Sequence, residues 1–121
     1  MQKESNISFG KYGEELASEY IKANGYLIIE RNFRAGKIGE IDIIAKKDEF
    51  ICFIEVKTRK GTYFGMPSEA VNWKKQTNIK RVAQMFLKLN RMEDFNIRFD
   101  IIEVLKKESE TAYIDIIEDA F

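Results

Sequence analysis

Histidine is absent from this chain of 121 residues, and cysteine occurs only once, at Cys52. Without histidine, the chain cannot use His-based general base catalysis or a triad that pairs histidine with serine or cysteine. A conventional structural zinc site and an internal disulfide are excluded as well. Any hydrolytic chemistry must therefore depend on carboxylates, lysines and a hard cation such as Mg²⁺.

Long apolar runs and an excess of one charge are also missing. No run approaches the roughly 18 residues that a membrane helix needs, and residues 1–8 lack the apolar stretch of a secretory signal. Together with the single cysteine, these absences predict a cytoplasmic protein that makes no membrane contact. The 20 basic and 20 acidic residues balance, whereas nucleic-acid binders usually carry a basic excess. Basic residues nevertheless cluster locally, either as a binding surface or as ordinary solvated charges.

Proline occurs once, and no repeat or linker divides the sequence. We therefore predict one domain over residues 1–121, with a core at about 8–105 and a C-terminal strand and tail at 106–121. Hydrophobic spacing predicts helices at 9–24 and from 68–71 to 89, with a loop at 61–68. β-type runs lie at 26–31, 38–45, 50–58, 96–105 and 112–117. The order α-β-β-β-α-β plus one extra strand indicates an α/β (α+β) fold, with a sheet covered on both faces.

Two predicted strands place ionisable residues inside otherwise apolar runs, Asp42 in one and Glu55 and Lys57 in the next. Buried charges are normally paired, neutralised or bound to a metal. If Lys47 pairs with Phe50 across a tight turn, Asp42 lies opposite Glu55, with the two Cβ atoms about 5 Å apart. Two carboxylates so close repel each other unless a cation binds between them.

This pair predicts a Mg²⁺ (or Mn²⁺) site at Asp42 and Glu55, with the backbone carbonyl of Val56 as a further candidate ligand. The alternative is a buried ion pair between Lys57 and one carboxylate, without chemistry. On the first helix, Glu14 lies on the inward face and is a further acidic candidate. Its alternative is a surface carboxylate paired with a nearby base.

The second predicted helix supplies candidate phosphate-binding groups. Lys75 shares a face with Ile79 and points towards the sheet, so we predict that Lys75 and Gln76 contact phosphate or orient the site. The alternative for Lys75 is a stem lying over the core with its amine in water. Arg59 and Arg34 are further nucleic-acid-binding candidates.

Other charged and aromatic residues have a structural or an open interpretation. Arg98 and Asp100 alternate with apolar residues, which favours a structural ion pair. Tyr63, Phe64 and Trp73 either stack on bases or serve as core or oligomer contacts.

The arrangement of Asp42 before Glu55-Val56-Lys57 resembles that of the PD-(D/E)XK nuclease superfamily. The chain is more closely similar to the YraN family of small bacterial proteins. Ile41 stands where the superfamily name has a proline. The matching stretches are Gly13 to Ala17, Gly39 to Asp42, Phe53 to Arg59 and Arg98 to Asp100.

The resemblance implies a restriction endonuclease-like core, a mixed sheet flanked by helices. It further implies that Asp42 and Glu55 bind a divalent metal, that Lys57 orients or activates water, and that Glu14 serves a second metal or a metal-bound water. The implied activity is Mg²⁺-dependent hydrolysis of nucleic acid, with DNA, including branched or repair intermediates, as the expected substrate. Endonuclease and exonuclease action both stay open, as does a homodimer. The alternatives are a nucleic-acid-binding module with little or no cleavage and a protein-interaction domain.

Overall fold

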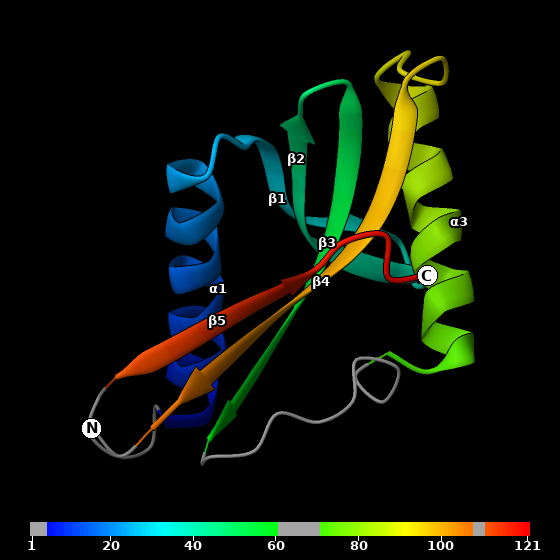
Figure 1. Ribbon diagram of the computed structural model, residues 1–121. Coiled ribbons are helices and arrows are strands. Elements are labelled where there is room, and N and C mark those ends of the chain that lie inside the picture. Colours follow the sequence, from blue (N-terminus) through cyan, green and yellow to red (C-terminus); the bar gives the residue numbers. More distant parts are fainter. Residues whose placement is uncertain (1–4, 61–70, 108–110) are drawn as a thin grey trace.

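A computed structural model of the chain describes residues 5–60, 71–107 and 111–121 (Figure 1). Its elements follow the predicted order and confirm the α+β class. In chain order they are α1 (Ser5–Ala23), β1 (Leu27–Ala35), β2 (Gly39–Lys47), β3 (Phe50–Lys60), α3 (Trp73–Leu89), β4 (Asn96–Lys106) and β5 (Ala112–Ile117).

The five strands form one mixed sheet in the order β1-β2-β3-β4-β5. Only β3 and β4 pair in parallel, and α3 lies between them in the chain, because a parallel pair needs a long connection. α1 packs on one face of the sheet and α3 on the other (Figure 1). The prediction of a sheet covered on both faces is therefore confirmed.

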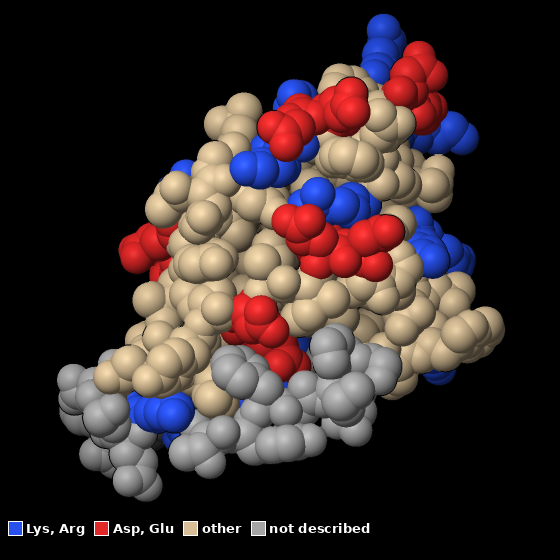
Figure 2. Space-filling model, viewed as in Figure 1, with Lys and Arg blue, Asp and Glu red and all other residues tan. Residues whose placement is uncertain are grey.

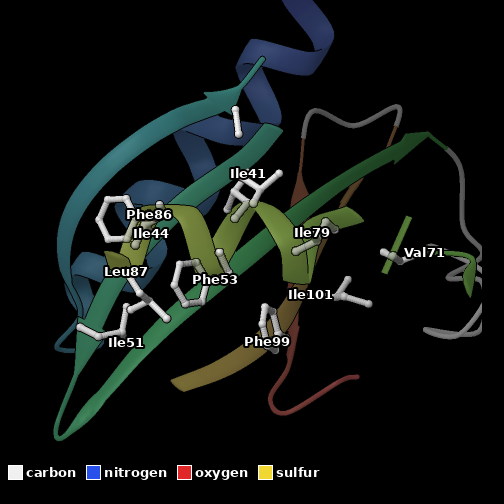
Figure 3. Close-up of a cluster of buried hydrophobic side chains, with 13 residues drawn as sticks. Ile41, Ile44, Ile51, Phe53, Val71, Ile79, Phe86, Leu87, Phe99 and Ile101 are labelled. Atoms are coloured by element: carbon white, nitrogen blue, oxygen red, sulfur yellow. The ribbon is translucent and has the colours of Figure 1, made fainter. Parts of the chain in front are cut away.

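Each face of the sheet has its own hydrophobic core. Under α3, the Phe86 ring packs edge-on against Phe53, with centroids 6.1 Å apart (Figure 3). Under α1, Ile21 packs with Ile54 and Ile102. Since side chains alternate along a strand, consecutive residues Phe53 and Ile54 serve opposite cores. Burial on both sides explains why the sequence of β3 is apolar almost throughout.

Several predicted boundaries were wrong by a few residues. β1 was predicted to end at residue 31 but continues to Ala35, because Phe33 pairs with Ile41 of β2 despite the polar residues around it. The second helix begins at Trp73, since the side chain of Asn72 caps it by accepting a hydrogen bond from the Lys75 N–H. The predicted loop at 61–68 lies outside the described residues. No described helix is both long and apolar enough to cross a membrane.

Candidate active site

The site lies where β2 separates from β3. The two strands pair from Lys47 opposite Phe50 to Ile43 opposite Ile54, which is the predicted register. That register directs Asp42 towards Glu55, but the regular pairing ends one residue earlier. Instead, the Val56 N–H donates a 2.8 Å hydrogen bond to Asp42 Oδ2. The Asp42 side chain therefore takes the place of a backbone acceptor for the Val56 N–H of β3.

Burial and a neighbouring carboxylate disfavour a negative charge on Asp42. Burial, followed by repulsion from Glu55, raises the pKa of Asp42 from 3.8 to about 7, although the Val56 hydrogen bond opposes this rise. Glu14 raises the Asp42 pKa further and Lys75 lowers it. Charged groups from α1, β2, β3 and α3 therefore act on one another at this point, far apart as they are in sequence.

Glu55 is 5% exposed, and its two carboxylate oxygens differ in their surroundings. Oε2 lies 2.6 Å from the Lys75 Nζ atom. Oε1 is buried, and no described residue forms a hydrogen bond with it. A buried acceptor without a partner is costly, so this oxygen is suited to bind a cation.

Two lysines border the carboxylates. Burial and the neighbouring Lys75 ammonium lower the pKa of Lys57, against the opposite effect of Glu55 and Asp42. Burial alone would lower the pKa of Lys75 too, but the contact with Glu55 outweighs it and the net shift is upward. The Lys75 side chain therefore points to the sheet and places its ammonium on a buried carboxylate.

Glu14 from α1 lies near this group but is engaged elsewhere. Its Oε1 accepts a 3.2 Å hydrogen bond from Asn32 Nδ2 and lies 3.8 Å from Arg31 Nη2. This contact with Arg31 agrees with the alternative interpretation, in which the Glu14 carboxylate pairs with a nearby basic side chain. Across the described part of the chain, no three acidic or cysteine side chains are grouped closely enough to hold one metal ion. Asp42 and Glu55 thus form a pair and not a complete cage.

Comparison with known proteins places this site within a family. The family model described as "Uncharacterised protein family UPF0102" matches residues 13–104, which include every site residue named above. The chain belongs to this family. UPF0102 is the YraN family that the motifs indicated, so that resemblance is confirmed.

Individual UPF0102 proteins are similar over nearly the whole chain. One from Clostridium botulinum is 49% identical over 118 residues, covering 96% of this chain and 95% of its own length. One from Acetivibrio thermocellus is 43% identical, covering 98% and 95%. A third, from Alkaliphilus oremlandii, is 52% identical over 101 residues, covering 82% and 86%.

The other candidates of this UPF0102 protein are engaged within the fold. Gln76 Nε2 donates a 3.0 Å hydrogen bond to the Val71 carbonyl. Arg34 pairs with Glu40 at 3.0 Å, beside a cavity of about 290 Å³ that Lys75 also lines. At Val56 the structure shows a role for the N–H, and ligation by the carbonyl stays a prediction.

Glu103 was not among the site residues predicted from the sequence. It is 2% exposed, lies opposite Lys57 in the parallel pairing of β3 and β4, and forms an ion pair with Arg59 at 3.4 Å. A single carboxylate in the run Ile101-Ile102-Glu103-Val104-Leu105 was the available signal. The Arg59 guanidinium therefore forms its ion pair with a buried carboxylate of the fold.

Two remaining predictions concern residues outside the site. Arg98 and Asp100 form the expected ion pair, with Nε 3.0 Å from Oδ1, and Asp100 also accepts a hydrogen bond from the Asp119 N–H. Trp73 is 79% exposed, which excludes a core role in this chain. Tyr63 and Phe64 lie outside the described residues.

Proposed function

We propose that this UPF0102 protein is a metal-dependent nuclease that hydrolyses phosphodiester bonds with Mg²⁺ or Mn²⁺. The main support is the mutually repelling pair of the half-buried Asp42 and the buried Glu55, with two lysine ammoniums beside it. Carboxylates suit a hard divalent cation, and ammoniums suit the phosphate oxygens of a substrate.

Asp42 and Glu55 are the residues that would hold the cation. The buried Glu55 Oε1 has a lone pair that no described residue uses, and a cation would relieve the repulsion that raises the Asp42 pKa. When bound, such a cation acidifies a water molecule and neutralises phosphate oxygens. The donor set therefore fits a divalent metal.

The lysines would act on the substrate. Lys57 shares its strand face with Glu55, so its ammonium can orient a water molecule towards the phosphate and stabilise charge that develops on the phosphate oxygens. Its lowered pKa brings it closer to proton exchange near neutral pH. Lys75 would hold the phosphate from the α3 side while it neutralises Glu55.

A second candidate function is nucleic-acid binding with little or no cleavage. It is favoured by the hydrogen bond from Asn32 to Glu14, which keeps the third carboxylate occupied. In that case Lys75 and Glu55 would form a structural ion pair.

The test is cleavage of duplex, single-stranded and branched DNA with Mg²⁺ or Mn²⁺. We expect cleavage by the wild type and by Glu49→Gln, a control at an exposed turn residue, and a loss of about a hundredfold in Glu55→Gln and Lys57→Met. Equal cleavage by all four proteins would indicate a contaminant. DNA binding with no cleavage by the wild type would support the second function.

A further inference from the structure

The helix α3 concentrates positive charge. Its 17 residues include five basic residues and no acidic residue. Because the whole chain is neutral, the rest of it carries five more acidic than basic residues. Figure 2 shows basic side chains along the edge of the molecule that carries α3, and acidic side chains in the middle of the face and at its upper end. The zero net charge therefore conceals an uneven distribution of charge between α3 and the rest of the chain.

Three of these basic residues form a line that we call the α3 stripe: Lys74, Arg81 and Lys88. They are seven residues apart, which is close to two helical turns, so they lie on one face of α3. All three are exposed, whereas Val82 and Phe86 face the core from the opposite side. At a rise of about 1.5 Å per residue, the stripe extends for roughly 21 Å.

Among the described residues, no acidic side chain pairs with any member of the stripe, whereas Lys75 pairs with Glu55. Solvated helix faces usually alternate charges of both signs, because pairs three or four residues apart stabilise the helix. The stripe instead has Thr77 and Gln84 between its basic residues. The positive charge of the stripe is thus not neutralised by an ion pair within the described part of the chain.

The stripe begins beside the candidate active site and is bordered by concave surface. Lys74 lines the cavity of about 290 Å³ that Lys75 also lines. Further along α3, Arg81 lines a depression of about 310 Å³ and Lys88 one of about 220 Å³. A ligand that follows the stripe towards Lys74 would therefore reach the cavity that Lys75 lines, and Lys75 contacts Glu55.

We propose that the α3 stripe binds the phosphate backbone of the nucleic-acid substrate, along the part of the substrate that extends beyond the active site. This inference rests on the proposed function for its choice of ligand. Each strand of a duplex advances about 3.4 Å per nucleotide, so the stripe spans about six base pairs. The preferred substrate is therefore a polynucleotide with about six base pairs on one side of the cleaved bond, and not a short fragment.

The first test compares Arg81→Gln/Lys88→Gln with Lys11→Gln/Lys22→Gln, two exposed lysines on α1 on the other face of the sheet. Binding to DNA and RNA duplexes is measured in EDTA, so that no cleavage occurs. We expect the stripe variant alone to lose about tenfold or more in affinity at low salt. The slope of log affinity against log salt should fall by about 1.8, since each phosphate contact contributes about 0.9.

The second test measures affinity against duplex length, from about 4 to 20 base pairs. Wild-type affinity should rise as the duplex grows past about six base pairs, and the stripe variant should lose that rise. Equal effects of the two double variants, or no effect of either, would overturn the proposal. So would binding that depends on the stripe with vesicles containing phosphatidylserine, but not with nucleic acid.

These outcomes separate the stripe from the catalytic proposal. If the wild type binds DNA through the stripe but never cleaves it, the proposed nuclease activity is wrong and the proposed binding by the stripe is supported. If the wild type cleaves DNA but the stripe variant binds DNA equally well, the proposed nuclease activity is supported and the proposed binding by the stripe is wrong. Circular dichroism of both double variants confirms that each one folds, since glutamine is a good helix former at exposed positions.

Discussion

The Val56 N–H and the Asp42 carboxylate are joined by a 2.8 Å hydrogen bond at the point where β2 separates from β3. This bond ties Asp42 to the backbone of the strand that carries Glu55. Burial, followed by repulsion from Glu55, raises the pKa of Asp42 to about 7, although this hydrogen bond opposes the rise. In the function that we propose, these two carboxylates would hold the cation.

Protonation of Asp42 predicts a pH-dependent stability. The folded pKa of about 7 exceeds the unfolded value of 3.8, so the folded state holds an extra proton between these values and its stability falls as pH rises from about 4 to 7. Asp42→Asn removes this loss, and its Asn side chain can still accept from Val56. We expect a gain of about 1 to 3 kcal/mol at pH 8 in EDTA, measured by urea unfolding.

The matched control for Asp42→Asn is Asp48→Asn, at an exposed turn position. It should follow the wild-type pH dependence. If the stability of Asp42→Asn also follows the wild-type pH dependence, Asp42 is already ionised in the folded protein at low pH, and the predicted rise in its pKa is absent.

Metal binding should depend on Glu55. Calorimetric titration with Mn²⁺ should show binding to the wild type, at least tenfold weaker binding to Glu55→Gln, and unchanged binding to Glu49→Gln. The melting temperature of the wild type should rise with Mn²⁺, because a ligand of the folded state alone stabilises it. Identical titration curves for all three proteins would place any metal elsewhere.

Lys75 should stabilise the fold by compensating Glu55. In Lys75→Met the buried carboxylate loses its cation, and we expect a loss of about 1 to 2 kcal/mol in EDTA. This is below the usual range for a buried pair because the Lys75 side chain is 43% exposed. Lys74→Met, one residue away and exposed, should leave stability unchanged. Added Mg²⁺ should narrow the difference, whereas equal stabilities in EDTA would argue against the compensation.

Gly13 sets the distance between α1 and β3. A Cβ atom at Gly13 would lie 2.9 Å from Thr58 Cβ and overlap its hydroxyl oxygen. Gly13→Ala should therefore push α1 away, with a cost of about 1 to 3 kcal/mol in chemical unfolding. Gly10→Ala, where no atom lies within 4 Å, should be neutral or stabilising by up to about 1 kcal/mol. Thr58→Ala should recover part of the Gly13→Ala loss, and a neutral Gly13→Ala would disprove the close approach.

The fold was largely predictable because its elements have strong local patterns. The apolar runs of β2 and β3 and the two-residue turn between them gave the correct register, from Lys47 opposite Phe50 onward. The end of β1 was not predictable, since residues 32–35 are held by pairing with β2 and not by their own propensity.

The site was predictable in part, for a related reason. An ionisable residue within an apolar strand is visible in any sequence, and that signal found Asp42 and Glu55. The same signal at Glu103 did not by itself indicate a site residue, because only the parallel pairing of β3 with β4 brings Glu103 beside Lys57. The contacts of Glu14 with Asn32 and of Arg59 with Glu103 join segments far apart in the chain.

The sequence by itself determined the family, the order of helices and strands, and which carboxylates and lysines are available for chemistry, since these depend on composition and local periodicity. The tertiary structure decided which charges meet. It ended the pairing of β2 and β3 at Ile43 opposite Ile54, placed Lys75 on Glu55 and left the α3 stripe exposed. Such encounters depend on how separate elements pack across the sheet, and electrostatic interactions between buried groups are set by those distances and not by spacing along the chain.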